Sequence, residues 1–366
     1  MATTTLTQVI PPSTTDSTVH AKIRYIPSGH TPEPSPHNFH LPAIAEFGDV
    51  RRLPLRDMRP LPTAEELPKA PKGTAQLSTH GFTAIRYPTS MHLSPYSPSS
   101  WKNAKLLEEL YVPETEEMVK KVTGAKTVVT EALLLRSAIW SEEDALATHA
   151  GHGKQKTQQE IEKETEEMNM HFPQFIGFSP VTGGASPAPK VHLDYAPNGA
   201  REHIRKYHPK LTAASSDIIA AEERLLAANK SLRYDYAASG EGPRWALYSI
   251  WRPIKPVKRD PLALGDARSF AEEDYIPIDV KAPNLGVPGT NTHNVESYLG
   301  RGSQSHEWYW VSNQKPEEVL VINLFDSDKE KETVAAGGTL HSSVELDNTE
   351  IEEARESLEL RCLAIW

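Results

Sequence analysis

The segment Val191-His192-Leu193-Asp194 has the residue pattern of a β-strand in a protein interior. Successive side chains of a strand point to opposite faces, so His192 and Asp194 share one face and Leu193 lies on the other. An imidazole and a carboxylate then stand side by side on one wall of a β-structure. The motif alone is weak evidence, since about one His-x-Asp is expected by chance in a chain with 15 histidines.

A second imidazole stands far downstream in GGTLHSSVEL (337–346), where His341 follows a Gly-Gly turn. Two histidines and one carboxylate on one face of six-coordinate iron(II) leave three positions open, which suit a bidentate 2-oxo acid and then O₂. Arg355 and Ser357 share a face if the last strand begins there, and a guanidinium beside a hydroxyl suits a carboxylate held in one orientation. The order of these residues predicts His192, Asp194 and His341 as metal ligands and a 2-oxoglutarate site at Arg355 and Ser357.

Three further residues are candidates for the 2-oxoglutarate site. Arg361 lies on the same nominal strand face as Arg355 and competes with it, ranking second. Arg252, in YSIWRPI (248–254), either contacts 2-oxoglutarate or substrate, or forms an ion pair with an acidic residue such as Asp266. Tyr248 is a candidate hydrogen-bond donor, although a tyrosine in such a segment is more often a core residue.

Other histidines and aromatic residues have simpler interpretations. His149 and His152 have ligand spacing but lie in a polar segment, which favours an exposed loop. His306 is interpreted as structural. Trp308 and Trp310 share a strand face and either contact an organic substrate or belong to the core, the commoner case.

The chain pattern predicts a mainly β fold with helical buttressing, either a sandwich or a barrel. Half of the 30 prolines lie between Pro11 and Pro98, which disfavours regular helix or central sheet there. We expect a flexible tail at 1–20, an extended arm at 21–100 that packs on the core, and a single domain at 101–366 with a helical insertion near 201–230. Strands and helices are expected in these segments: AKIRYI (21–26), FTAIRY (82–87), a helix at 100–123 stopped by Gly124, AKTVVTEALLLRSAIW (125–140), a helix at 200–229 broken at Pro209, RWALYSIWRPI (244–254), HEWYWVS (306–312), EEVLVINLF (317–325) and ESLELRCLAIW (356–366).

Composition limits the partners. The net charge of −10 argues against nucleic acid or an anionic membrane as the main partner. Cys362 is the only cysteine and forms no internal disulfide, and no secretory signal or membrane-spanning run is recognised. We therefore expect a cytoplasmic protein with a small-molecule substrate, and leave open a homodimer contact through the helix near 201–230.

Several blocks of the chain resemble the fungal hydroxylase/desaturase proteins of the aspergillic-acid type, which are related to the bacterial cephem 7α-methoxylase component. The resemblance covers roughly residues 75–366, and the blocks follow the family's order. They are TGAKTVV (123–129), VHLDYAPNGA (191–200), YSIWRPIKPVKRDPLALGDARSF (248–270), HEWYWVSNQKPEEVLVINLFDS (306–327), LHSSVEL (340–346) and ARESLELRCLAIW (354–366).

This resemblance implies a double-stranded β-helix (jelly-roll) core. It also implies His192, Asp194 and His341 as iron ligands, with Arg355 and Ser357 at the C5 carboxylate of 2-oxoglutarate. The long interval between Asp194 and His341 is expected to hold the inserted helix and a loop at 271–303.

The expected function is that of an Fe(II)/2-oxoglutarate-dependent dioxygenase of fungal secondary metabolism. Such an enzyme oxidises an unactivated C–H bond of a small molecule by hydroxylation, desaturation or oxidative cyclisation. The alternative is a non-catalytic jelly-roll accessory protein that binds a metabolite or a partner enzyme. A metal-dependent hydrolase lacks an obvious general base in this sequence.

Overall fold

The computed structural model describes residues 18–140, 170–178, 184–287 and 292–366. Its strands are β1 (His20–Tyr25), β2 (Asp49–Asp57), β3 (Phe82–Arg86), β4 (Thr127–Arg136), β5 (Gln174–Ile176), β6 (His192–Leu193), β7 (Trp245–Pro253), β8 (Leu262–Gly265), β9 (Tyr275–Pro283), β10 (Thr292–Gly300), β11 (Trp308–Trp310), β12 (Glu318–Asp326), β13 (His341–Ser343), β14 (Glu345–Leu346) and β15 (Ser357–Ile365). Its helices are α1 (Leu77–His80), α2 (Ala104–Leu106), α3 (Val112–Thr123), α6 (Pro197–Lys206), α7 (Pro209–Ala214), α8 (Ser216–Ala227) and α9 (Leu232–Ser239). His149 and His152 lie outside the described residues.

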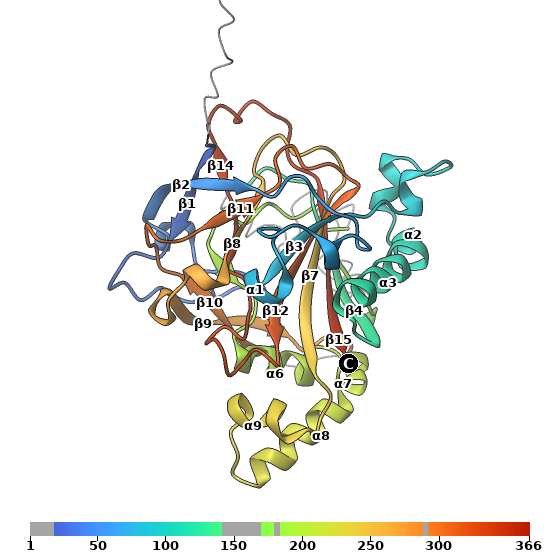
Figure 1. Ribbon diagram of the computed structural model, residues 1–366, viewed down its shortest axis with the longest axis vertical. Coiled ribbons are helices and arrows are strands. Elements are labelled where there is room, and N and C mark those ends of the chain that lie inside the picture. The colour runs from blue at the N-terminus through green and yellow to red at the C-terminus, as the bar shows by residue number, and fades with distance from the viewer. Residues whose placement is uncertain (1–17, 141–169, 179–183, 288–291) are drawn as a thin grey trace, which may run out of the picture.

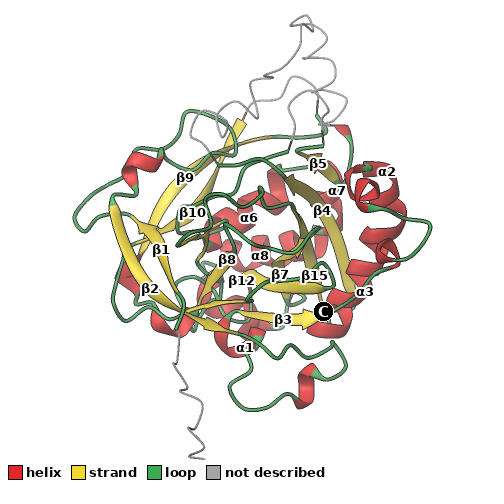
Figure 2. Ribbon diagram, turned by 90° about the horizontal axis from the view of Figure 1, so that it is seen from above, coloured by secondary structure: helices red, strands yellow, loops and turns green. Residues whose placement is uncertain are grey.

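The strands form two sheets that face each other (Figures 1 and 2). The larger sheet has the order β14-β1-β2-β11-β8-β13-β6-β10-β9, and the smaller has the order β3-β12-β7-β15-β4-β5. Neighbouring strands are antiparallel except for the β2–β11 and β4–β5 pairs. The mainly β architecture predicted from the sequence is confirmed.

The smaller sheet is covered on both faces, which explains why every residue of β7 and β12 is buried. On β7, the side chains of Trp245, Leu247 and Trp251 belong to the core between the two sheets. Tyr248 and Ile250 belong to a second core, on the outer face of the sheet, together with side chains of α3. Strand parity therefore decides which residues of β7 face the larger sheet.

Helices cover the outside of the sheets. Helix α3 packs against β4, and Figure 1 shows α2 and α3 along one side of the molecule and α6 to α9 at one end. The helix predicted at 100–123 is divided by a π-helical turn at Leu107–Tyr111, and α3 ends at Gly124 as expected. Gly124 has φ +79°, a conformation that costs glycine little because it has no Cβ. The helix predicted at 200–229 is broken before Pro209, also as expected, and begins three residues earlier.

The predicted loop at 271–303 was wrong. These residues contain β9 and β10, which pair with each other over nine residue positions. The sequence of β9 mixes exposed charged residues with buried Ile276 and Ile278, and this edge strand is weakly apolar because one side chain in two faces solvent. β10 pairs on its other edge with β6, so this hairpin supports the segment that carries His192.

The N-terminal segments join the sheets. β1 and β2 extend the larger sheet and β3 edges the smaller one, so residues 20–86 contribute strands to the same two layers. The expected boundaries at residues 20 and 100 remain a prediction, and most of the expected tail lies outside the described residues. No helix within the described residues has the length and apolar character of a bilayer-spanning segment.

Candidate metal centre

His192 and His341 lie directly opposite each other on the neighbouring antiparallel strands β6 and β13. Their ring centroids are 4.5 Å apart. Directly opposed residues of an antiparallel pair have the shortest side-chain separations in a sheet. Strand pairing therefore brings together two imidazoles that are far apart in sequence.

Asp194 lies just beyond β6, where the chain bends towards α6. Its backbone carbonyl accepts a hydrogen bond of 2.6 Å from Ser297 Oγ on β10. At Gly199, a Cβ would lie 1.8 Å from the carbonyl oxygen of Glu296, so only glycine permits α6 to approach β10 this closely. The Asp194 backbone is thus fixed by the strand that also supports His192.

The three side chains converge on one point. The distance from His192 Nε2 to Asp194 Oδ1 is 3.9 Å, and that from His341 Nε2 to Asp194 Oδ2 is 3.8 Å. One potential ligand atom from each residue lies within 4.8 Å of the others. The structure therefore brings together the three residues that the sequence selects as metal ligands.

The hydrogen bonds of this cluster fit a divalent cation. His192 Nδ1 lies 2.6 Å from the carbonyl oxygen of Lys190, and His341 Nδ1 lies 2.9 Å from that of Thr339. Each Nδ1 then carries the proton, and the lone pair of each Nε2 is directed into the cluster. Burial, reinforced by the neighbouring His341, lowers the pKa of His192 to about 4, so this imidazole is neutral at neutral pH. Asp194 Oδ2 is buried and has no hydrogen-bond partner among the described residues, as expected of an oxygen that serves a cation.

A small pocket adjoins the two histidines and is called here the arginine pocket. Its charged residues, apart from the histidines, are Arg136, Arg355, Arg361 and Glu359. An excess of arginine over carboxylate suits an anionic ligand beside the metal. The other lining residues are Ala188, Ser249, Trp251, Leu262, Ile322 and Ser343.

Arg355 is a buried cation without an ion-pair partner among the described residues. Its Nη1 donates to the carbonyl oxygen of Asp260 at 2.5 Å and lies 3.4 Å from Ser343 Oγ, and its guanidinium stacks over Trp251 at 5.1 Å. Its Nε is buried without an acceptor in the described part of the chain, and the hydroxyl of Ser357 is also buried there without a partner. Burial, reinforced by Arg136, lowers the pKa of Arg355 to about 9. Both side chains have unused hydrogen-bonding capacity of the kind that a carboxylate satisfies, but only Arg355 lines the arginine pocket.

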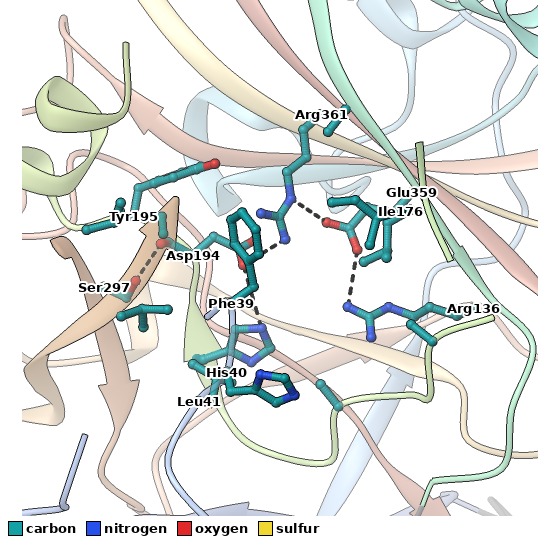
Figure 3. Close-up of a pocket in the computed structure, with 18 of the residues that line it drawn as sticks. Phe39, His40, Leu41, Arg136, Ile176, Asp194, Tyr195, Ser297, Glu359 and Arg361 are labelled. Atoms are coloured by element: carbon teal, nitrogen blue, oxygen red, sulfur yellow. Dashed lines mark hydrogen bonds and ion pairs between the residues drawn. The ribbon is translucent and has the colours of Figure 1, made fainter. Parts of the chain in front are cut away.

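Arg361 has a different role from Arg355, although both side chains line the arginine pocket. Its Nη2 donates to Asp194 Oδ1 at 3.0 Å and its Nε donates to Glu359 Oε1 at 2.8 Å (Figure 3). Burial favours a lower pKa for Arg361, but Asp194 and Glu359 outweigh it and raise the pKa well above the usual value. Its charge is therefore already paired within the protein.

The structure does not bring Tyr248 or Arg252 to this site. Both lie on the outer face of β7, whereas Ser249 and Trp251 face the arginine pocket. Arg252 donates to the backbone carbonyls of Pro316 at 2.6 Å and Tyr87 at 2.8 Å, and not to Asp266. These two candidates fail because residues one position apart on a strand point in opposite directions.

A larger pocket lies on the other side of the histidine–aspartate cluster and shares His192, Arg136, Glu359 and Arg361 with the arginine pocket. Its walls are mainly apolar, and the side chains of Tyr207, Val280 and Val295 contribute to them together with Phe39, Leu41 and Ile176, which are labelled in Figure 3. Trp308 and Trp310 do not line it and belong to the core. The histidine–aspartate cluster thus adjoins both the arginine pocket and the larger, mainly apolar pocket.

Several buried polar residues near the cluster were missed in the sequence. Glu131 Oε2 lies 2.8 Å from His203 Nε2, and Glu131 accepts from the hydroxyl of Tyr195 at 3.3 Å, all within the wall of the large pocket. Glu359 and Arg136 were also missed, although the alternation Ser-Leu-Glu-Leu-Arg at 357–361 places Glu359 on the face of Ser357 and Arg361. No comparable signal marks Glu131 or His203, because their hydrogen bond joins β4 and α6, which are far apart in sequence.

His306 lies away from the cluster. It is hydrogen-bonded to Asp274 at 3.0 Å and stacks on Phe270 with a centroid separation of 3.9 Å. These contacts agree with its interpretation as a structural residue.

Comparison with known proteins gives a consistent set of relatives. The family described as "Oxidoreductase/YMDC permease-like domain" matches residues 68–365. The chain is 40% identical to the oxidoreductase chry3 of Gibberella zeae, over 94% of this chain and 97% of the relative. It is 33% identical to the gibberellin cluster GA4 desaturase of Gibberella fujikuroi (79% and 82% covered) and 26% identical to the alpha-ketoglutarate-dependent dioxygenase tstK of Talaromyces stipitatus (90% and 87% covered).

A solved structure supports the fold. The iron and alpha-ketoglutarate-dependent endoperoxidase NvfI superimposes with a TM-score of 0.57 at 20% identity, covering 94% of this chain and 97% of that one. This likeness confirms the predicted double-stranded β-helix core.

Proposed function

Since this chain belongs to the oxidoreductase family that includes fungal desaturases and alpha-ketoglutarate-dependent dioxygenases, we propose that it is an iron(II)- and 2-oxoglutarate-dependent oxygenase of fungal secondary metabolism. One observation carries the proposal. His192, Asp194 and His341 each place a potential ligand atom within 4.8 Å of the others, beside a pocket that contains Arg355, and within the described residues neither Asp194 Oδ2 nor the Arg355 charge has a partner. Two imidazoles and one carboxylate on one side of an ion are typical of non-haem iron(II) oxygenases.

In this proposal, His192, Asp194 and His341 hold the iron. When bound with 2-oxoglutarate and O₂, the iron supplies the oxidation of an unactivated C–H bond, and 2-oxoglutarate is converted to succinate and CO₂. The backbone carbonyls of Lys190 and Thr339 keep both imidazoles in the Nδ1-protonated form, so both Nε2 atoms remain available.

Arg355 and Ser357 bind the far carboxylate of 2-oxoglutarate. The Arg355 Nε–H and the Ser357 hydroxyl both lack partners within the described residues, and a carboxylate accepts from both. Stacking on Trp251 and the bond to the Asp260 carbonyl fix the orientation of the guanidinium before the ligand binds. Arg361 is unsuited to this task because Asp194 and Glu359 already occupy its donors.

The large pocket receives the substrate. Its mainly apolar walls favour a largely apolar small molecule and exclude bulk water from the metal side. Hydroxylation, desaturation and oxidative cyclisation are all outcomes of C–H oxidation in such a pocket.

We also propose that the protein acts in the cytoplasm without nucleic acid, in keeping with its single buried cysteine, Cys362, and its net charge of −10. A homodimer stays a prediction.

The test is an anaerobic titration of the purified protein with Fe(II) and 2-oxoglutarate, followed by admission of O₂. We expect a visible charge-transfer band that requires both additions, and succinate after O₂ is admitted. A well-folded protein that shows neither signal would contradict the proposal and favour a non-catalytic accessory protein.

A further inference from the structure

Four charged side chains form a continuous series of ion pairs between the two pockets (Figure 3); Glu359 is buried, and Asp194, Arg361 and Arg136 are partly buried. Asp194 is bonded to Arg361 at 3.0 Å, Arg361 to Glu359 at 2.8 Å, and Glu359 lies 3.5 Å from Arg136. The Arg136 guanidinium in turn donates to the carbonyl oxygen of Ser186 at 2.5 Å. Signs alternate along the chain, so each desolvated charge has an opposite neighbour.

These ion pairs leave the two carboxylate oxygens of Asp194 in different environments. Oδ1 accepts from Arg361, whereas Oδ2 has no partner among the described residues and lies on the side of His341. The guanidinium therefore occupies one carboxylate oxygen and leaves the other free. A charge-assisted bond of this kind fixes the rotation of the carboxylate as well as its position.

Arg361 is itself held from its other side. Glu359 and Arg361 are two residues apart on β15 and therefore share a face, which brings the carboxylate of Glu359 to Arg361 Nε. Arg361 uses separate nitrogens, Nη2 and Nε, for its two carboxylate partners. A lysine, with one ammonium group, does not reproduce this fixed geometry.

We propose that Arg361 is a positioning residue that restricts Asp194 to binding the metal through Oδ2 alone, and that Glu359 holds Arg361 in place. This inference rests on the proposed iron site. A carboxylate that binds through one oxygen leaves three positions of a six-coordinate ion to other ligands, whereas binding through both oxygens leaves two. Arg361 thus preserves a position that the reaction requires.

The test compares Arg361→Gln with Arg355→Gln, a matched change at a buried arginine two residues before β15. Iron affinity is measured by anaerobic equilibrium dialysis, and the wavelength of the charge-transfer band is recorded with saturating Fe(II) and 2-oxoglutarate. We expect Arg361→Gln to weaken iron binding about 10- to 100-fold and to shift the band, the range typical for loss of a group that orients a ligand. We expect Arg355→Gln to leave iron affinity in the absence of 2-oxoglutarate within about threefold of wild type, because Arg355 does not contact a proposed metal ligand.

Two additional arms separate positioning from general structural damage. Glu359→Gln keeps the side-chain shape and removes the charge, so we expect the same band shift with a smaller loss of iron affinity, about threefold to tenfold, because a neutral bond is about half as strong. In Arg361→Ala, millimolar guanidinium, far below denaturing concentrations, is expected to enter through the large pocket that Arg361 lines and to restore iron affinity. A merely structural role predicts no such rescue.

The outcomes distinguish this inference from the proposed function. If wild-type protein binds neither iron nor 2-oxoglutarate, the proposed function fails and the inference fails with it. If wild type binds both, but Arg361→Gln and Glu359→Gln retain wild-type iron affinity and an unshifted band, the inference is overturned and the proposed function stands. If Arg361→Gln does not fold, Glu359→Gln decides by the same measurements.

Discussion

Replacing Arg355 by glutamine separates a ligand-binding arginine from a structural one. In the ligand-free protein this guanidinium is buried, has no ion-pair partner among the described residues, and keeps an Nε–H without an acceptor. Loss of one charged hydrogen bond to 2-oxoglutarate costs about 1.5–3 kcal/mol, which raises the Kd for 2-oxoglutarate about 10- to 150-fold. The iron affinity of the 2-oxoglutarate-free protein is expected to change little.

The same substitution is expected not to destabilise the ligand-free protein, although it weakens 2-oxoglutarate binding. Burial lowers the pKa of Arg355 to about 9, below its value in the unfolded chain. The unfolded state therefore binds this proton more tightly, so the cation disfavours folding at every pH below about 9, including neutral pH. We expect Arg355→Gln to unfold at the same temperature as wild type or at a higher one when 2-oxoglutarate is absent, and to gain less from added 2-oxoglutarate.

The assay combines the anaerobic charge-transfer titration with thermal unfolding, and Arg252→Gln is the control. Arg252 is also fully buried on the same sheet, but it donates to backbone carbonyls on the outer face. Its loss should lower stability by several kcal/mol, because it leaves two carbonyls unsatisfied, and leave the Kd for 2-oxoglutarate unchanged. An unchanged Kd in Arg355→Gln, or a 2-oxoglutarate defect in Arg252→Gln, would refute the assignment.

Three further results are expected. Asp194→Ala removes a proposed ligand and should abolish iron binding and succinate formation, while the far-ultraviolet circular dichroism spectrum stays near that of wild type. Iron retained by this variant would exclude Asp194 from the site. His306→Ala loses the hydrogen bond to Asp274 and the stacking on Phe270, so it should lower the free energy of unfolding, measured by urea titration, by about 1–3 kcal/mol without altering iron binding. An iron-binding defect in a folded variant would show that His306 is more than structural. Burial lowers the pKa of His293 to about 4, and its ring nitrogens have no partners among the described residues, so the unfolded state binds this proton first and the free energy of unfolding decreases as the pH falls from about 6.5 towards 4. His293→Phe should flatten this decrease by up to about 1.4 kcal/mol per pH unit, and an identical slope in the variant would contradict the burial of a neutral imidazole.

The sequence predicted the strands that carry the site more reliably than the direction of individual side chains. β7, β12 and β15 were recognised because strands covered on both faces are almost continuously apolar. The same property makes it impossible to tell from the sequence which of two successive side chains faces the larger sheet, since nearly every position of such a strand is apolar. Tyr248 and Arg252 were selected for their side-chain chemistry, and the pattern did not show that they belong to the outer face.

By itself the sequence predicted the mainly β class, the segments of most strands, and His192, Asp194 and His341 as candidate ligands, which the structure brings together. Local alternation and residue chemistry can be read directly from the amino-acid sequence. Only the tertiary structure showed which arginine is already paired. Arg361 lies on β15 and Arg355 lies two residues before that strand, and they differ in whether a carboxylate within the described residues reaches them. That difference depends on long-range packing, in which the segment after β6 places Asp194 beside Arg361, whereas Arg355 lies against Trp251 with no ion-pair partner among the described residues.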